Sequence, residues 1–373
     1  MFEKYKQSIL FHNPDYHCTF FYQEALQKLG WRVDIFVPNY YPRNLLYSAE
    51  KILRVKKFTG NYSIDYVIWF LRTTLRYKYI VYYGRPVDLL WLTKRYFPIL
   101  NFEPLLLFLK ILKKKIIYIP SGCRDEFTQL DFSLFDKGNV CGNCGFYDKC
   151  DEKSNIRNLY LINKYFDLVI GLGFTAPKIR KLKAMKWKSF NLCEYNPKLV
   201  VPKQFVLPKS KNLRILHSTN LEGRTDNGKD IKGSKYVEEA VSRLVKEGYS
   251  CELLRLTDIE SKYMRFYQVQ ADLVVDQLIY GHFGSTSLEG LALGKPVICY
   301  FNSVWKQNYI KTHGINVWPF IEANTKNIYG VLKNLMDNPQ LIKVYSKLSL
   351  EFTGNYLDIE TNVKEFITTL ESI

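Results

Sequence analysis

Uninterrupted apolar segments are short in this chain of 373 residues. The most apolar stretch, residues 98–115, is broken by Glu103 and Lys110 and closed by three lysines, whereas a membrane-spanning helix needs roughly 18 to 20 apolar residues in a row. Residues 1–13 offer neither the apolar core nor the small-residue cleavage site of a secretory signal peptide. We therefore expect neither a single-span membrane protein nor a secreted one.

Internal repeats and low-complexity tracts are missing as well. Hydrophobic residues make up 47% of the chain and charged residues 24%, which is the balance of a folded globular protein and not of a disordered one. The length exceeds one ordinary hydrophobic core, because domains hold roughly 100–200 residues. The sequence therefore predicts two domains.

Acidic residues are scarce relative to basic ones. The chain has 36 Asp and Glu against 53 Lys and Arg, a formal net charge of +17, and basic clusters stand at 113–115, 178–188 and 209–211. Such an excess of positive charge favours binding to an anionic partner: nucleic acid, an anionic membrane surface or a phosphorylated substrate. A merely solvated basic surface is the alternative.

Cysteine is too sparse for a disulfide framework in a chain this long. Half of the eight cysteines stand in apolar surroundings and are predicted core residues, namely Cys18, Cys193, Cys251 and Cys299. The other four are crowded together, namely Cys123, Cys141, Cys144 and Cys150. Cys141, Cys144 and Cys150 have C-x2-C-x5-C spacing, and with Cys123 as a fourth ligand they suit one tetrahedral ion. We predict a structural zinc site on these four thiolates in a reducing compartment, with an iron–sulfur cluster or metal-free thiols as the alternatives.

Strand-like apolar runs alternate with helical stretches through the first half of the chain. The runs are 8–13, 31–37, 77–84, 114–122 and 166–173, and the helical stretches are 86–97, 102–112 and 155–165. Parallel strands joined by helices produce this alternation. The first 200 or so residues therefore predict a parallel, doubly wound sheet.

A second alternation follows the stretch 196–212, which is rich in proline and lysine. Strands are expected at 213–219, 249–257, 271–279 and 295–301, helices at 233–248, 260–269 and 285–294, and the last 50 residues have helical periodicity. The predicted fold class is α/β, with two Rossmann-like doubly wound domains facing each other across a cleft, and C-terminal helices. The predicted domains are 1–203 with a cysteine-rich insertion at 123–150, 204–350, and a helical tail at 351–373.

The first helix of the second half begins with small and basic residues. The strand before it ends in HST, a polar loop follows, and Lys232-Gly233 opens the helix. Backbone N–H groups and the helix dipole at such a start bind phosphate, and basic side chains add charge-assisted contacts. The candidates are Arg224, Lys229 and Lys232, with a solvated capping loop as the alternative.

Further donors gather in the segment 281–301, GHFGSTSLEGLALGKPVICYF. Glycines in it allow a ligand to approach the backbone closely, and the helix start adds N–H and hydroxyl donors. These positions are Gly284, Ser285, Thr286 and Ser287. Glu289 lies in the first turns of an otherwise apolar helix, where its carboxylate suits two vicinal sugar hydroxyls. A glutamate that stabilises the helix dipole is the alternative.

The order of these motifs resembles the nucleotide-sugar half of GT-B glycosyltransferases of family 4. The chain has HSTN, then Lys-Gly at a helix start, then an Ala-Asp strand, G-x-F-G and E-x-x-A-x-G-K-P-V-I, all within 213–301. The rest of the chain agrees with that family in layout only. The resemblance implies that Lys232 binds the donor diphosphate and that Glu289 holds the ribose. It also implies transfer with retention, without a dedicated base or a catalytic divalent cation.

One position departs from the family pattern. Family members carry a first glutamate eight residues before the ribose-binding one, and this chain has Gly281 there. The nearby Asp276 and His282 are candidates to take over part of the role of that glutamate, with a grip on the donor through backbone N–H groups as the alternative. Some relatives share the order D-Q-x-x-x-G-x-x-G found here. We therefore predict a variant subfamily in which His282 is a candidate catalytic residue.

Polar residues also follow predicted strands of the first half. Arg124 and Asp125 stand after Gly122-Cys123 at the end of the strand 114–122, a position that relatives use on the acceptor side. Arg124 is predicted to contact a phosphate, and Asp125, as a candidate catalytic residue, to orient a hydroxyl. His17, near the start of a predicted helix that ends near Leu29-Gly30, is a second acceptor-side candidate. A loop salt bridge and a structural histidine are the alternatives.

Together these features predict a hexosyltransferase-type GT-B enzyme. It would move a sugar from a nucleotide-sugar donor to a glycan or lipid-diphosphate-linked acceptor in surface polysaccharide assembly. The basic, aromatic first half suits peripheral binding to the inner face of an anionic membrane, so we expect a cytoplasmic location and no nucleic-acid partner. The alternatives are a basic zinc-containing nucleic-acid-binding protein and a GT-B-type sugar-nucleotide epimerase, which needs no acceptor.

Overall fold

The elements of the chain form two compact units. The computed structural model describes residues 7–14, 17–37, 52–56, 58–84, 103–123, 129–136, 139–173, 179–219, 229–257 and 259–373. The first unit holds Met1–Thr128, Asp151–Trp187 and Ile359–Ile373, and the second holds Gln129–Cys150 and Lys188–Asp358. The predicted division into 1–203, 204–350 and 351–373 stays a prediction.

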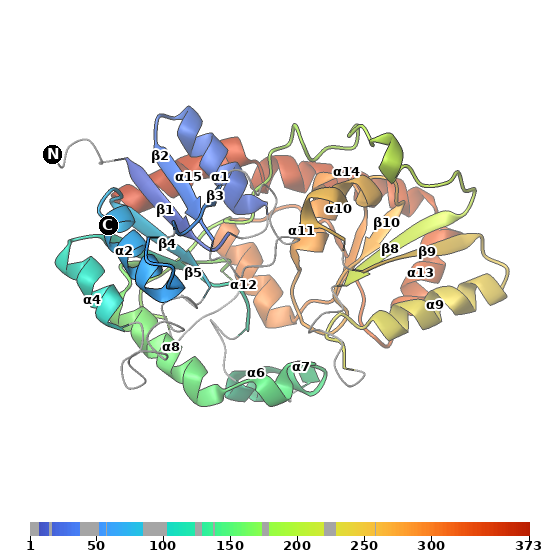
Figure 1. Ribbon diagram of the computed structural model, residues 1–373. Helices are drawn as coiled ribbons and strands as arrows, with labels where there is room; N and C mark the ends of the chain where they lie inside the picture. Colours follow the sequence, from blue (N-terminus) through green and yellow to red (C-terminus); the bar gives the residue numbers. More distant parts are fainter. Residues whose placement is uncertain are drawn as a thin grey trace. The chain divides into compact units, whose positions relative to one another are not determined.

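The first unit contains a seven-stranded parallel sheet (Figure 1) with the order β3-β2-β1-β4-β5-β6-β7. Its strands are β1 (Ser8–His12), β2 (Arg32–Phe36), β3 (Ile52–Leu53), β4 (Tyr79–Tyr83), β5 (Lys115–Ile119), β6 (Leu168–Gly171) and β7 (Leu182–Ala184). The order runs outward from β1 in both directions, and His12 pairs in register with Phe36 on one side and Tyr82 on the other. This is the doubly wound topology that the sequence predicts.

Helices cover both faces of this sheet. On one face lie α1 (Cys18–Lys28) and α15 (Ile359–Glu371), where Tyr22 stacks on Trp187 at 4.3 Å between ring centroids and Phe366 meets Tyr22 edge-on at 5.1 Å. The other face packs an aromatic and aliphatic core against α2 (Tyr62–Thr74), α4 (Glu103–Ile111) and α8 (Glu152–Tyr165). The last helix of the chain therefore completes the core of the first unit.

The second unit contains a five-stranded parallel sheet with the order β12-β11-β10-β8-β9 (Figure 1). Its strands are β8 (Leu213–Thr219), β9 (Cys251–Thr257), β10 (Leu273–Val275), β11 (Val297–Cys299) and β12 (Phe320–Glu322). Its helices are α6 (Gln129–Asp136), α7 (Asn139–Gly142), α9 (Ser234–Lys246), α10 (Ser261–Gln268), α11 (Ser285–Ala292), α12 (Ser303–His313), α13 (Ile328–Asp337) and α14 (Gln340–Tyr356). Short 3-10 helices stand at Tyr147–Lys149 and Lys203–Phe205.

Segment 129–150 joins the second unit although it precedes α8 in the sequence. Phe132 of α6 is 3% exposed. Its ring centroid lies 6.1 Å from those of Tyr280 and Trp305. An aromatic side chain of this size buries much apolar area, so Phe132 anchors the segment to the second unit.

The predicted strands and helices are largely confirmed. Each predicted apolar run contains a strand of the structure, and the last 50 residues are helical as expected. Strands β3, β7 and β12 are not foreseen by the sequence; they hold two or three residues each and lie at sheet edges. Such short edge strands carry too few residues to show a period. The predicted helix at 86–97 lies outside the described residues.

Within the described residues, no helix combines the length and the apolar character needed to cross a bilayer.

Candidate functional site

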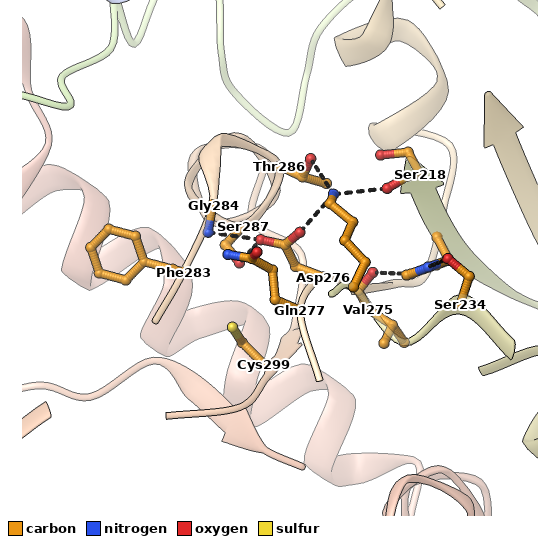
Figure 2. A network of polar contacts seen from close by, with 12 residues as sticks. Ser218, Ser234, Val275, Asp276, Gln277, Phe283, Gly284, Thr286, Ser287 and Cys299 are labelled. Atoms are coloured by element: carbon orange, nitrogen blue, oxygen red, sulfur yellow. Dashed lines mark hydrogen bonds and ion pairs between the residues drawn. The ribbon is translucent and has the colours of Figure 1, made fainter. Parts of the chain in front are cut away.

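A buried polar network lies at the carboxyl ends of β8 and β10 (Figure 2). The carboxyl ends of parallel strands are where open α/β sheets bind ligands. The network joins Lys232, two residues before the start of α9 at Ser234, to the first turn of α11, and it contains several of the residues that the sequence singles out.

Lys232 is the cationic member of this network. Its side chain is buried, and its ammonium group donates to the carbonyl oxygen of Ser218 at 2.8 Å. The same nitrogen lies 2.9 Å from Oδ1 of Asp276 and 3.4 Å from the hydroxyl of Thr286. Gly233, with φ +74°, turns the chain directly into α9, a conformation that glycine adopts without strain. The predicted Lys-Gly helix start therefore directs its ammonium towards α11.

Asp276 is the acidic member, and it is fully buried directly after β10. Its Oδ2 accepts hydrogen bonds from the Gly284 N–H at 2.9 Å and from the Ser287 hydroxyl at 2.7 Å (Figure 2). Burial opposes ionisation of this carboxyl, but the charge of Lys232 and the hydrogen bonds prevail and lower its pKa. The site therefore holds an ion pair inside the protein.

Glycine is required at position 284. A Cβ atom there would lie 2.9 Å from Oδ2 of Asp276 and 3.4 Å from Nε2 of Gln277. Both neighbours are buried, and Gln277 is itself held by a 2.8 Å hydrogen bond to the carbonyl of His282. The glycine predicted to allow close approach of a ligand thus allows close approach of a carboxylate of the protein itself.

Glu289 is a second buried carboxyl in α11, and it is 5% exposed. Burial raises its pKa from 4.5 to about 7. A 2.9 Å hydrogen bond from Nε2 of Gln268 and the charge of Lys232 act in the opposite direction and lower the pKa, but by less than burial raises it. The charge of Asp276 also raises this pKa. The charge of Lys232 therefore acts on the carboxyl of Glu289, and their shared site stays a prediction.

His217 ties the sheet to the start of α9. Its Nδ1 lies 2.8 Å from the carbonyl oxygen of Val275, and its Nε2 lies 2.8 Å from the hydroxyl of Ser234, which in turn contacts Asp230. Burial and the charge of Lys232 lower the pKa of His217 to about 4. The ring is therefore neutral at pH 7 and serves as a fixed hydrogen-bonding link.

The other predicted donor-binding residues occupy different environments. Ser285 and Thr286 are half-buried at the start of α11, whereas Ser287 is fully buried against Asp276. Lys229 places its ammonium 5.5 Å from the ring centroid of Tyr147, a cation–π contact. Arg224 lies outside the described residues.

His282 is half-buried beside the network. Its Nδ1 lies 2.8 Å from the carbonyl oxygen of Phe283, and its ring packs against Tyr280 and Trp305 at 4.5 and 5.7 Å between centroids. Burial lowers its pKa to about 4, so the ring is neutral at pH 7. Its catalytic role stays a prediction.

Of the acceptor-side and catalytic candidates in the first unit, only His17 falls within the described residues. It precedes α1, is 1% exposed, and lies 5.5 Å from Phe21 between ring centroids. Arg124 and Asp125 lie outside the described residues. Their acceptor-side and catalytic roles stay predictions.

The four cysteines predicted to bind zinc do not form a metal site. Cys123, Cys141, Cys144 and Cys150 all lie in described residues, yet those residues contain no group of three or more His, Cys, Asp or Glu side chains placed to hold a metal ion. The chain turns through α7 at Cys141 and through a 3-10 helix before Cys150, and Cys123 belongs to the other unit. The structure therefore does not support the predicted zinc site on these four thiolates.

Two residues of the network carry roles that sequence reasoning did not assign. The sequence suggests Asp276 only as a substitute for the missing glutamate, whereas its partner in the structure is Lys232. Gln268, the last residue of α10, donates to Glu289 and is not among the predicted residues. For Asp276 the sequence does contain a signal: an acidic residue directly after a buried apolar strand is itself buried and therefore needs a charged partner.

No protein-family model matches the chain, and neither does any protein of curated function. Solved structures do match over nearly the whole length. HepE of Anabaena in complex with UDP-glucose has 13% identity and a TM-score of 0.59, with 98% of this chain and 100% of that chain covered. The sucrose-phosphate synthase of Thermosynechococcus elongatus has 14% identity and a TM-score of 0.58 over 98% and 99% of the two chains. A glycosyltransferase of Rickettsia africae has 12% identity and a TM-score of 0.60 over 100% and 99%.

These similarities define the class of fold. The chain has the GT-B fold, with two Rossmann-like α/β domains, as its sequence predicts. At such low identities the likeness concerns the fold alone, because one fold hosts many functions.

Proposed function

We propose that this protein is a glycosyltransferase that uses a nucleotide-sugar donor. The observation that carries the proposal is the position of the buried Lys232 ammonium, 3.4 Å from the Thr286 hydroxyl at the start of α11. A cation and a helix start together bind phosphate groups well. The GT-B fold, shared with HepE in complex with UDP-glucose, supports the same proposal.

In this proposal the donor diphosphate binds at Lys232 and at the first turn of α11. The first N–H groups of a helix have no partner within the helix, and the half-buried Ser285 and Thr286 add hydroxyls. Glu289, three residues after Thr286 and therefore on the same side of α11, accepts the ribose hydroxyls. Arg224 and Lys229 supply further positive charge.

The proposed reaction breaks the bond between the anomeric carbon and the diphosphate oxygen. The nucleoside diphosphate leaves with the electron pair. An acceptor hydroxyl forms the new bond on the same face of the sugar and passes its proton to the departing diphosphate oxygen. Lys232 and the N–H groups of α11 stabilise the negative charge that develops on the leaving group. No catalytic divalent cation is required in this scheme.

For the acceptor we propose a glycan or a lipid-diphosphate-linked glycan in surface polysaccharide assembly. The net charge of +17 supports an anionic partner, and an anionic membrane surface attracts such a protein without a membrane-spanning helix. The proposed location is therefore peripheral, at the cytoplasmic face of the membrane.

The test is a thermal-shift screen with UDP-, ADP-, GDP- and CMP-sugars, followed by calorimetry with the best donor. Lys232→Ala should weaken binding of the matching nucleoside diphosphate by at least about tenfold, because a charge-assisted contact is lost. Lys235→Ala is the matched control, since this lysine lies near Lys232 in sequence but its side chain is 80% exposed. Equal affinities of the Lys232 variant and the control would contradict the assignment.

The alternative functions predict different results in binding and turnover assays. A nucleic-acid-binding protein would be stabilised by an oligonucleotide, with an effect that falls steeply with salt, and not by any nucleotide sugar. Its zinc-dependent form loses support because the described cysteines do not form a metal site. A sugar-nucleotide epimerase would turn over the donor with no acceptor present.

A further inference from the structure

The carboxylate of Asp276 connects four elements of the second unit. It follows β10 directly, contacts the ammonium that also binds the end of β8, and accepts two hydrogen bonds from the first turn of α11. Because Lys232 precedes α9, the start of that helix is joined as well. Figure 2 shows Asp276 between Ser218 on one side and Gly284 and Ser287 on the other.

This carboxylate is held firmly in place. It is 0% exposed, and its backbone N–H donates to the carbonyl of Ile298 at 2.9 Å. Its Oδ2 lies so close to Gly284 that a Cβ atom would not fit there. An incoming anion therefore cannot take the place of Asp276 without breaking two hydrogen bonds and an ion pair inside the protein, which is costly.

The same contacts decide which donors remain for a ligand. The N–H of Gly284, which the sequence predicts to bind the sugar donor, donates to Asp276 instead. Ser287 is also directed to Asp276. The ammonium of Lys232 has its shortest contacts to Ser218 and Asp276, at 2.8 and 2.9 Å, and its longest to the Thr286 hydroxyl. The contact with Thr286 is the one that an anion can replace at least cost.

We propose that Asp276 is a positioning residue that fixes the Lys232 ammonium against the first turn of α11, and that the donor diphosphate binds beside this ion pair without displacing it. This inference rests on the proposed function, which it deepens. In it the diphosphate contacts the Thr286 side of the ammonium and the N–H groups of Ser285 and Thr286. The negative charge of Asp276 is needed to hold a buried cation in one place.

The test is binding of inorganic pyrophosphate, of UDP, ADP, GDP and CDP, and of the matching nucleosides to the wild type and to Asp276→Asn, measured by calorimetry. We expect the variant to bind pyrophosphate and the preferred diphosphate at least about tenfold more weakly, because a charged contact is lost. Nucleoside affinity should change by less than about twofold, because a nucleoside makes no contact with the anion site. A general loss of structure would weaken both.

Two further variants keep the test decisive if Asp276→Asn folds poorly. Ser287→Ala removes one hydrogen bond to Oδ2 but leaves the ion pair, and it should weaken pyrophosphate binding by about two- to tenfold. Lys232→Gln with Asp276→Asn removes both buried charges and should bind pyrophosphate no more weakly than Lys232→Gln alone, because residues that act through one another are not additive. Asp272→Asn is the control, an exposed carboxylate at the other end of β10.

The outcomes separate the two proposals. Wild-type-like or tighter binding of pyrophosphate by Asp276→Asn overturns the positioning role, and so does a double variant whose loss equals the product of the two single losses. Both results leave the donor site itself intact. Failure of the wild-type protein to bind any of the phosphate compounds refutes the anion site, and with it both the positioning role and the proposed function.

Discussion

The buried carboxyl of Glu289 should make the stability of this protein depend on pH. Burial raises the pKa of Glu289 from 4.5 to about 7. Between these two values the folded protein keeps a proton that the unfolded chain has lost. The stability contributed at this position is therefore fully present below about pH 4.5 and falls as the pH rises to about 7.

The size of the effect follows from this shift. Each unit of pKa corresponds to about 1.4 kcal/mol, so a rise from 4.5 to about 7 is worth about 3 kcal/mol. Glu289→Gln removes the titration but keeps the size of the side chain and its ability to bond with Gln268. The variant should therefore gain about 3 kcal/mol in free energy of unfolding relative to the wild type between about pH 4.5 and about pH 8.

Urea unfolding at several pH values over that range measures this difference. Glu239→Gln is the control, because that side chain is 60% exposed and lies in a loose ion pair with Lys235 at 3.7 Å. Its plot of unfolding free energy against pH should run parallel to that of the wild type. If the Glu289→Gln curve also runs parallel to the wild type, the carboxyl of Glu289 is not perturbed and the reasoning from burial is refuted.

The same titration should appear in donor binding. An ionised carboxylate accepts hydrogen bonds from two vicinal ribose hydroxyls better than a protonated one. Donor affinity is therefore expected to rise with pH through about 7, and binding below that pH should release a proton. Calorimetry in two buffers of different ionisation enthalpy detects this release. An affinity that does not change with pH would remove Glu289 from the ribose-binding role.

Three further predictions concern the fold. Gly284→Ala should lower the free energy of unfolding in urea by about 1–3 kcal/mol, because its Cβ would lie 2.9 Å from Asp276. Gly330→Ala in α13 is the control: a Cβ there has nothing within 4 Å, so this variant should be neutral or more stable by about 0.5–1 kcal/mol. Phe366→Ala should cost about 3–5 kcal/mol by the same measurement, because it empties a fully buried site in α15; a loss under about 1 kcal/mol would show that α15 is not part of that core. Cys144→Ser should change stability by less than about 1 kcal/mol, and metal analysis of the native protein should find less than about half an equivalent of zinc, since a structural site would hold close to one.

Local pattern was enough to predict most of the fold. Apolar runs followed by glycine or polar residues marked nine of the twelve described strands, and periodic stretches marked many of the helices, because burial on a sheet or along one side of a helix imposes a period on the sequence itself. Helices α2, α6 and α12 were not predicted. Lys232 and Glu289 could also be predicted as donor-binding residues from local pattern, since each stands near the start of a predicted helix. The short edge strands escaped because two or three residues show no period.

Partners far apart in the sequence could not be predicted in this way. The ion pair between Lys232 and Asp276 and the hydrogen bond between Gln268 and Glu289 depend on which strands and helices become neighbours. The cysteine spacing favoured zinc because closeness in sequence was taken for convergence in space, and the described residues contain no group of three or more such ligands placed to hold a metal ion.

The sequence by itself determined two α/β halves, a lysine at the start of one helix and a carboxylate near the start of another, because these properties follow from local periodicity and local turns. Only the tertiary structure decided that Asp276 balances that lysine, that Phe132 anchors segment 129–150 to the second unit, and that α15 completes the first. The physical reason is that a buried charge or aromatic ring must find a partner in space, and its distance along the chain places little restriction on which partner that is.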